Sequence, residues 1–337
     1  MSLPPMITAK ALGAMPQFTL EALGERTLTR ALAKAELPYD FVESRDGYIP
    51  KQALASFIGE VGRAVGDENI GLLWAPELTV ADYGAWGRYV LGAPTLRAAL
   101  ERAQKVMPYH SSHDRTFFRS VGDLCGYEYR FSLKAHVAYP SIAFSALGAV
   151  LSVFVHYMRP KWRPKQIRID LPRPTAHEEV EATFGCPVTW EQDRLEILFE
   201  QSALITAAKG ETPTTATLEE IARERSNVTP SCFTDVVSRI MELQIATNGI
   251  SLEGAARTIN FGPRALQRRL RTEGTNFRSL ANQVKASRAK EMLRVGSLSV
   301  QEVAVDLGFE NSQNFSRAFR KATGLTPSEY AAFCGHR

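Results

Sequence analysis

Residues 299–322, SVQEVAVDLGFENSQNFSRAFRKA, contain two apolar patterns of helical spacing on either side of a Gly-Phe turn. The first pattern places apolar residues at i, i+3, i+4 and i+7, which is one face of a helix: Val300, Val303, Ala304 and Leu307. Gly308 tolerates the left-handed backbone with which a helix ends. The second pattern has the same spacing of apolar residues: Phe315, Ala318, Phe319 and Ala322. Polar residues lie on the other sides of this helix: Gln313, Arg317, Arg320 and Lys321. The segment therefore predicts a helix, a tight turn and a second helix.

A similar unit lies 48 residues earlier. Its first helix has apolar residues at the same spacing, and a turn at Asn260-Phe261 follows: Leu252, Ala255, Ala256 and Ile259. The next stretch, GPRALQRRL at 262–270, places its cationic and amide residues on one face and two leucines on the other: Arg264, Gln267, Arg268 and Arg271, opposite Leu266 and Leu270. One basic face is typical of any solvated helix, but two at equivalent places in a repeat favour helix-turn-helix units. Ser299 and Glu302 form a capping box, and residues 276–295 predict a linking helix that ends at Gly296.

Charge is distributed unevenly along the 337 residues. Residues 236–337 contain 15 Lys and Arg and 8 Asp and Glu, a net charge of +7. That leaves 25 of the 40 basic and 28 of the 36 acidic residues for the rest of the chain, a net charge of −3. A basic segment on a slightly acidic body indicates a polyanionic partner for that segment.

The four cysteines are far apart and form no CxxC pair, which suits a reducing cytoplasm and argues against a structural zinc site. The first ten residues, MSLPPMITAK, do not have the pattern of a signal peptide. Residues 137–158 contain no charged residue and approach the length of a membrane span. A small, partly polar stripe favours a buried core helix instead: Ser141, Ser145, Gly148 and Ser152. We therefore expect a cytoplasmic protein without a membrane partner.

The first two-thirds of the chain predict an α+β domain. Helical patterns cover 15–36, 50–66, 95–107 and 138–158, and strand-like runs cover 115–121, 127–133, 166–171 and 195–199. Residues 209–217, KGETPTTAT, are polar and contain Pro and Gly, so we expect a linker to begin there. From residue 218 onward we expect only helices.

Residues 288–330, RAKEMLRVGSLSVQEVAVDLGFENSQNFSRAFRKATGLTPSEY, closely resemble the signature of AraC/XylS-type transcription regulators. With the first copy, the resemblance covers about 100 residues. It implies an all-α, homeodomain-like DNA-binding domain at 236–337, with helix-turn-helix motifs at about 251–271 and 299–321. The rest would be an effector-sensing and dimerisation domain at 1–210 and a linker at 211–235.

The resemblance also assigns candidate contacts with double-stranded DNA. The base-reading candidates are Arg264, Gln267 and Arg268 in the first copy and Ser312, Gln313, Asn314 and Arg317 in the second. Arg pairs well with guanine and Gln with adenine. Arg271, Lys290 and Lys321 are expected on phosphates, and a phosphate or solvent role stays open for each of the others. Asn260 in place of the commoner turn glycine and Gly254 inside the first helix make the first copy less regular.

Residues 79–109 and 184–204 resemble more loosely the arabinose-binding-type, or ornithine-regulator-like, effector domain of a subgroup of this family. The strand IRIDLPRP departs from the subgroup's usual pattern. The resemblance implies a small-molecule effector, but it assigns neither the ligand nor the residues that bind it.

Three other features contain residue types that occur in metal, redox or ligand sites. His110, His113 and Asp114 have metal-compatible spacing, but no further ligand completes a set, so we interpret them as loop residues. Cys186 is interpreted as a core residue, not a redox sensor. The aromatic residues Tyr83, Trp86 and Tyr89 fit an effector pocket and ordinary core packing equally well. No nucleotide-binding or catalytic motif is present, so we expect neither a cofactor nor catalytic residues.

We therefore expect a ligand-responsive transcription activator that forms homodimers and contacts DNA and RNA polymerase. Two alternatives are a dimeric regulator without a ligand and, with less support, an enzyme domain fused to a DNA-binding module.

Overall fold

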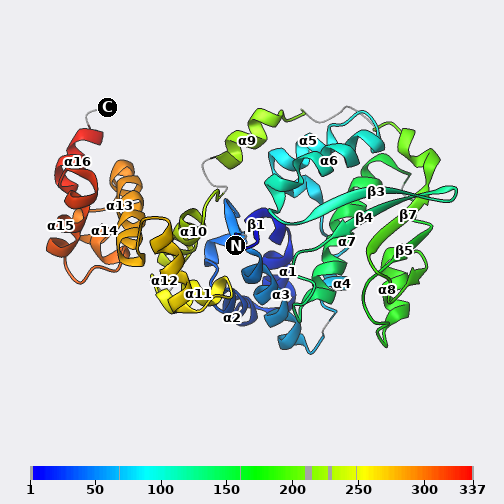
Figure 1. Cartoon of the computed structure of the whole chain (residues 1–337), viewed down its shortest axis with the longest axis horizontal. Coiled ribbons are helices and arrows are strands. Elements are labelled where there is room, and N and C mark those ends of the chain that lie inside the picture. The colour runs from blue at the N-terminus through cyan, green and yellow to red at the C-terminus, as the bar shows by residue number, and fades with distance from the viewer. Residues whose placement is uncertain are drawn as a thin grey trace. The chain divides into compact units, whose positions relative to one another are not determined.

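The computed structural model describes residues 3–67, 69–159, 161–208, 215–226, 230–247 and 249–335 and shows two compact units (Figure 1). The larger unit consists of Pro5–Ala35 and Asp40–Thr229. The smaller unit consists of Met1–Pro4, Glu36–Tyr39 and Pro230–Arg337. The predicted fold class, an α+β domain followed by an all-α tandem helix-turn-helix domain, is confirmed.

Helices dominate the first half of the larger unit. The elements are β1 (Met6–Thr8), η1 (Ala9–Leu12), α1 (Met15–Leu23), α2 (Glu25–Ala35), η2 (Tyr39–Val42), β2 (Tyr48–Pro50), α3 (Lys51–Val65), α4 (Gly71–Trp74), η3 (Val80–Tyr83), α5 (Ala85–Leu91) and α6 (Leu96–His110). The helix predicted over 15–36 is two helices, because Gly24, at φ 82°, ends α1. Strands β1 and β2 form a small antiparallel pair.

A five-stranded sheet forms the second half of this unit. Its elements are β3 (Arg115–Val121), β4 (Leu124–Arg130), α7 (Tyr139–Tyr157), β5 (Gln166–Arg168), α8 (His177–Phe184), β6 (Val188–Thr189), β7 (Leu195–Glu200) and η4 (Gln201–Ile205). The strand order is β3-β4-β7-β5-β6, and only β5 and β6 pair in parallel. Strand β4 begins three residues before the predicted 127–133, because it pairs with β3 from Val121↔Leu124 onward across a turn at Gly122, φ 59°. Beyond Arg130 the chain leaves the sheet, and the Ser132 N–H donates to Asp114 Oδ1 at 3.0 Å.

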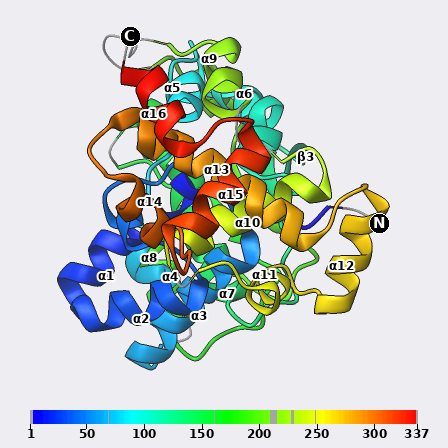
Figure 2. The same ribbon diagram turned by 90° about the vertical axis from the view of Figure 1, so that its left-hand side faces the viewer.

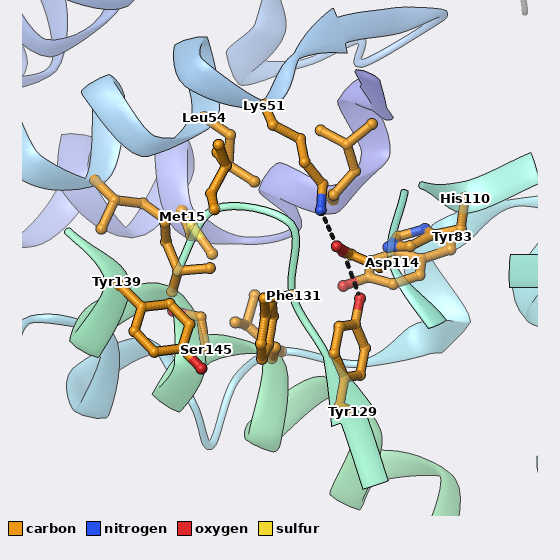
Figure 3. Close-up of a pocket in the computed structure, with 17 residues that line it drawn as sticks. Met15, Lys51, Leu54, Tyr83, His110, Asp114, Tyr129, Phe131, Tyr139 and Ser145 are labelled. Atoms are coloured by element: carbon orange, nitrogen blue, oxygen red, sulfur yellow. Dashed lines mark hydrogen bonds and ion pairs between the residues drawn. The ribbon is translucent and has the colours of Figure 1, made fainter. Parts of the chain in front are cut away.

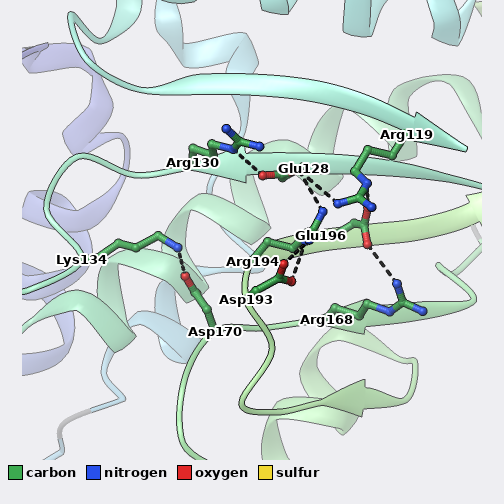
Figure 4. A network of polar contacts seen from close by, with 9 residues as sticks. All are labelled: Arg119, Glu128, Arg130, Lys134, Arg168, Asp170, Asp193, Arg194 and Glu196. Atoms are coloured by element: carbon green, nitrogen blue, oxygen red, sulfur yellow. Dashed lines mark hydrogen bonds and ion pairs between the residues drawn. The ribbon is translucent and has the colours of Figure 1, made fainter. Parts of the chain in front are cut away.

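The two faces of the sheet differ. One face is apolar and packs on helices, with Phe199 of β7 lying 5.0 Å from Phe154 of α7 between ring centres. The opposite face places Glu128 and Glu196 side by side across β4 and β7, both almost fully buried, beneath arginines from neighbouring strands and loops (Figure 4). The arginines that lie within 4 Å of the two carboxylates are Arg119, Arg130, Arg168 and Arg194. Burial raises the pKa of Glu196, and Arg119 and Arg168 oppose that shift.

Helix α7 is the long apolar segment that could be mistaken for a membrane span. It is long and apolar enough by composition, yet 56% of its most apolar 18-residue window is buried inside the protein. Ser141 and Ser145 are buried, and Gly148 lets α7 approach Ala75 so closely that a Cβ there would overlap the Ala75 carbonyl. Ser141 and Gly148 of the small stripe therefore pack against the segment around α4.

Helix α9 (Leu218–Ser226) lies within the segment predicted as a linker and packs on α5 and α6 of the larger unit. Ile221 is fully buried there. Glu224 accepts a hydrogen bond from the backbone N–H of Ala85 at 3.0 Å and forms an ion pair with Lys10 at 3.3 Å. Part of the predicted linker 211–235 is thus a helix that packs on the larger unit.

The smaller unit is all helical across its described residues. Its helices are α10 (Phe233–Ile245), α11 (Leu252–Thr258), α12 (Pro263–Thr272), α13 (Phe277–Val295), α14 (Val300–Asp306), α15 (Ser312–Thr323) and α16 (Pro327–Gly335). Helix α13, which begins after an Asn276 cap and ends at Gly296 with φ 74°, contacts α10, α14, α15 and α16 (Figure 2). Phe315 and Phe319 of α15 are buried against Ala289 and Leu293 of α13.

Candidate nucleic-acid interface and effector pocket

The two helix-turn-helix corners have the same hydrogen-bond geometry. Asn260 and Gly308 both have left-handed backbones, with φ of 55° and 68°. In each corner the next residue, a phenylalanine, donates its N–H back to an alanine carbonyl: Phe261 to Ala256 at 2.8 Å and Phe309 to Ala304 at 2.9 Å. Asparagine tolerates this conformation better than most residues, so the first corner forms without the glycine. The capping box predicted at Ser299 and Glu302 also forms, with bonds of 2.7 and 3.2 Å.

The second helices of the two copies present basic faces. On α12 the leucines Leu266 and Leu270 are buried, and the predicted contact residues lie on other sides. Of the predicted residues, Gln267 and Asn314 are half-buried and the rest are exposed: Arg264, Arg268, Arg271, Ser312, Gln313, Arg317 and Lys321. Each helix therefore combines a buried apolar side with an accessible side of guanidinium, ammonium and amide groups.

The second copy contains one additional residue between the corner and the second helix. The corners are 48 residues apart (260 and 308), whereas the helix starts are 49 apart (263 and 312). The buried pairs Leu266–Leu270 and Phe315–Phe319 also differ by 49. Structural equivalence therefore pairs Arg268 with Arg317, Arg264 with Gln313, and Arg271 with Arg320.

Asn314 holds the side chain of Arg317. The Arg317 Nη2 atom donates to Asn314 Oδ1 at 2.6 Å, one turn earlier on α15. The backbone N–H of Asn314 is itself bonded to the Asn311 side chain, which caps the helix, at 2.8 Å. The guanidinium is thus oriented by a local chain of hydrogen bonds before it meets any partner.

Two basic residues have contacts on other helices. The Arg269 guanidinium lies 4.5 Å from the ring centre of Phe233, at the start of α10. Glu273, next to α12, accepts from the Phe233 and Thr234 N–H groups at 3.1 and 2.8 Å and so caps α10. Lys290, expected near a phosphate, is half-buried with its ammonium 6.0 Å from the Tyr330 ring centre on α16.

A pocket lies inside the larger unit, where six segments of the chain meet (Figure 3). About 60 Å³ of it is open to the centres of water molecules. Its wall is mainly apolar: Ile7, Ala11 and Met15 from the N-terminal segment, Leu54 and Ile58 from α3, Leu78, Phe131 and Leu133 from loops, and Ile142 and Ala146 from α7. Its polar lining residues are Lys51, Tyr83, His110, Asp114, Tyr129, Tyr139 and Ser145.

A buried ion pair crosses one end of this pocket. The Lys51 ammonium contacts Asp114 Oδ1, and both side chains are at most 6% exposed. Asp114 also accepts from the Tyr129 hydroxyl and the Ser132 N–H, each at 3.0 Å, and Lys51 donates to Ser132 Oγ at 3.0 Å. Burial would raise the pKa of Asp114, but Lys51 and these hydrogen bonds hold it below its usual value. Burial lowers the pKa of Lys51, and Asp114 offsets only part of that shift.

Aromatic rings and one hydroxyl complete the polar part of the pocket. His110 stacks on Tyr83 at 4.9 Å between ring centres and lies 5.2 Å from Trp86. Burial raises the pKa of Tyr83 above its usual range. Ser145 is 4% exposed, and its Oγ has no hydrogen-bond partner among the described residues.

Comparison with known families agrees with both units. The model of the arabinose-binding domain of AraC transcription regulators, N-terminal, matches residues 27–207, and a helix-turn-helix domain model matches residues 255–332. The chain belongs to the AraC-type transcription regulators. It is a DNA-binding transcription regulator with an effector-binding domain in front of its helix-turn-helix domain.

Named relatives of this AraC-type regulator are 23–32% identical to it over the regions that match. An ornithine utilization regulator from Pseudomonas aeruginosa is 26% identical over 278 residues, which are 79% of each chain. The regulator VirS of Mycobacterium tuberculosis is 32% identical over 91 residues, 27% of each chain. A crystal structure of the transcriptional regulator CdpR from P. aeruginosa covers 91% of this chain and 97% of its own, at 23% identity and a TM-score of 0.42.

The pocket of this AraC-type regulator was largely missed from the sequence. Tyr83, weighed as a pocket residue, lines it, whereas Trp86 donates its indole N–H to the Val106 carbonyl at 2.9 Å. His110 and Asp114, weighed as metal ligands, are pocket residues, and the Asp114 carboxylate is engaged by Lys51. Lys51 lies on an ordinary helical pattern. Ser145 belongs to the predicted small stripe of α7, but that stripe predicted packing, and no local signal connects either residue to a pocket.

Proposed function

We propose that this regulator reads DNA with α12 and α15 and responds to a small molecule held in the pocket of its larger unit. The observation that carries the proposal is the pair of equivalent basic faces. The proposed base-reading residues are Arg264, Gln267, Arg268, Ser312, Gln313, Asn314 and Arg317, and the proposed phosphate contacts are Arg271 and Lys321. Arg317 is supported further by its orientation on Asn314.

The proposal also covers where the protein acts, how it assembles and how a ligand controls it. We infer a cytoplasmic homodimer that activates transcription by contacting RNA polymerase when its ligand is bound. A ligand can shift the equilibrium between an activating and a non-activating state of the regulator only if it binds the two states with different affinity. The pocket supports a sensor over a regulator that only dimerises, because its Ser145 hydroxyl is buried without a partner among the described residues. The name of the ornithine-utilization relative does not assign ornithine to this chain.

Glu224 offers a route from the pocket to the helix that precedes the DNA-binding unit. Its carboxylate binds Lys10 and Ala85, and each is close in sequence to a pocket residue, Ala11 and Tyr83. Gly84, at φ 65°, leaves the space for this contact, since a Cβ there would lie 2.8 Å from both Glu224 Oε1 and Lys10 Nζ. Movement of the pocket wall would therefore disturb the contacts of Glu224 with Lys10 and Ala85, which bind α9 to the rest of the larger unit.

Selection of bound oligonucleotides from a random pool by the full-length protein tests the DNA-binding proposal. We expect one enriched site with two contacted segments, about one helical turn apart, on one side of the duplex. Retention of the pool without enrichment over scrambled competitor would contradict it.

Glu224→Gln tests the route to α9, and Glu219→Gln, an exposed residue on the same helix, is the matched control. We expect faster hydrogen exchange in residues 218–226 and an altered affinity for the selected site in Glu224→Gln only. Wild-type exchange and affinity in both variants would remove Glu224 from the mechanism.

A further inference from the structure

The polar groups of the pocket restrict the chemistry of its ligand. We infer that the effector is a compact, mainly apolar molecule of zero net charge that carries a hydrogen-bond acceptor for Lys51 and a polar group for Ser145. This inference rests on the proposed function of the pocket as the effector site. A ligand of this class is neither a cationic amino acid nor a sugar.

The charge balance is already complete before a ligand binds. Lys51 and Asp114, the lysine and the carboxylate among the lining residues, form an ion pair at side-chain exposures of 6% and 1% and so offset each other's charge. An anion or a cation would add an uncompensated charge to a mainly apolar site, which is unfavourable. A cation would also need a free carboxylate, and Asp114 already accepts from Lys51, Tyr129 and Ser132.

Two polar groups keep unused hydrogen-bonding capacity. An ammonium has three N–H donors, and the described contacts of Lys51 use one for Asp114 and one for Ser132 Oγ. The remaining donor is available to a carbonyl or hydroxyl oxygen of a ligand. Ser145 Oγ, on α7, is buried without a partner in the part of the chain that the structure describes. A buried hydroxyl in this state favours a ligand that can bond to it.

The rest of the wall disfavours a polyol. Leu54, Ile58, Leu78 and Ile142 offer no hydrogen bonds, whereas a pentose carries oxygen on every carbon. Hydroxyls placed against such a wall would lose water without gaining a partner. The open volume of about 60 Å³ is smaller than the ~150 Å³ apolar cavity that holds benzene. Both observations favour a compact ligand with few polar atoms.

Matched neutral, anionic and cationic probes test this inference on the full-length protein. The first set is isobutyramide, isobutyrate and isobutylamine, and the second is the smaller series acetamide, acetate and ethylamine. L-ornithine and L-arabinose are added as the cationic amino acid and the sugar. Calorimetric titration and saturation-transfer NMR measure the binding. We expect an amide to bind at least tenfold more tightly than its charged counterparts, with no response to ornithine or arabinose.

Ser145→Ala locates the binding, and Ser141→Ala, a buried serine on the same helix that does not line the pocket, is the control. We expect amide affinity to fall about five- to tenfold in Ser145→Ala and to stay unchanged in Ser141→Ala. Amide binding that Ser145→Ala leaves unchanged would overturn the inference.

A charged probe or arabinose that binds more tightly than the amides, and is sensitive to Ser145→Ala, would overturn the inferred ligand class while keeping the pocket as the effector site. Absence of binding by every probe would overturn the proposed effector site, and the inferred ligand class with it.

Discussion

Removal of the Arg317 guanidinium is expected to change base preference without unfolding the protein. The side chain is exposed, and its described hydrogen bond is to Asn314 on the preceding turn. Exposed substitutions of this kind change stability by about 0.5 kcal/mol or less. A bidentate Arg–guanine contact contributes roughly 1–3 kcal/mol of discrimination, so Arg317→Ala should weaken binding to the selected site by about 5- to 150-fold.

The Asn314 hydrogen bond allows a sharper test. Asn314→Ala keeps the guanidinium but removes the 2.6 Å contact that orients it. Fixing a rotamer-rich side chain costs about 0.5–1.5 kcal/mol, so this variant should bind about 2- to 13-fold more weakly. If Asn314 acts through Arg317, the double variant should bind no more weakly than Arg317→Ala. Additive losses would instead support the proposed contact of Asn314 itself with a base.

Fluorescence anisotropy at fixed salt, on the selected site and its single-base variants, measures these effects. Arg317→Lys is the matched control, because it keeps the charge and loses the planar fork. It should retain the salt dependence and lose preference at one position. Equal weakening by Arg317→Ala on every sequence, scrambled DNA included, would assign the residue to phosphate and refute base reading.

Three further predictions concern other parts of the chain. Lys321→Ala should weaken binding to all DNA sequences equally and lower the slope of log K against log salt by about one unit; an unchanged slope in salt titrations would reject the phosphate contact. Gly148→Ala should destabilise the larger unit by about 1–3 kcal/mol or more, because its Cβ would overlap the Ala75 carbonyl. Gly59→Ala, in α3 of the same unit, would make only an ordinary contact of 3.5 Å with the Ala138 Cβ and should not destabilise it; urea unfolding compares the two variants. The pKa of Asp114 is lower in the folded state than in the unfolded state, so its contribution to stability should be complete above the unfolded pKa of about 4 and be lost as pH falls through the lower folded value. Thermal unfolding from pH 7 to pH 2 measures this loss. An Asp114→Asn variant with the same acid dependence as the wild type would exclude Asp114 as its cause.

The features that the sequence predicts correctly depend on local interactions. The capping box at Ser299, the end of α13 at Gly296 and the left-handed corners at Asn260 and Gly308 each depend on a few neighbouring residues. The spacing of apolar residues within a helix is equally local. Helices with one apolar face must bury it against each other, so the repeat itself determined the all-helical DNA-binding unit.

Tertiary structure decided the register, the pocket and the contacts of α9. Strand β4 starts where Leu124 pairs with Val121, not where its most strand-like residues begin. Lys51, Asp114 and Ser145 are separated by at least 31 positions, and only packing of α3, α7 and the sheet edge brings them to one cavity. A buried charge is tolerated only when its partner arrives from elsewhere in the chain, and no local pattern specifies that partner. For the same reason, Glu224 could not be distinguished from other surface glutamates until Lys10 and Ala85 were placed beside it.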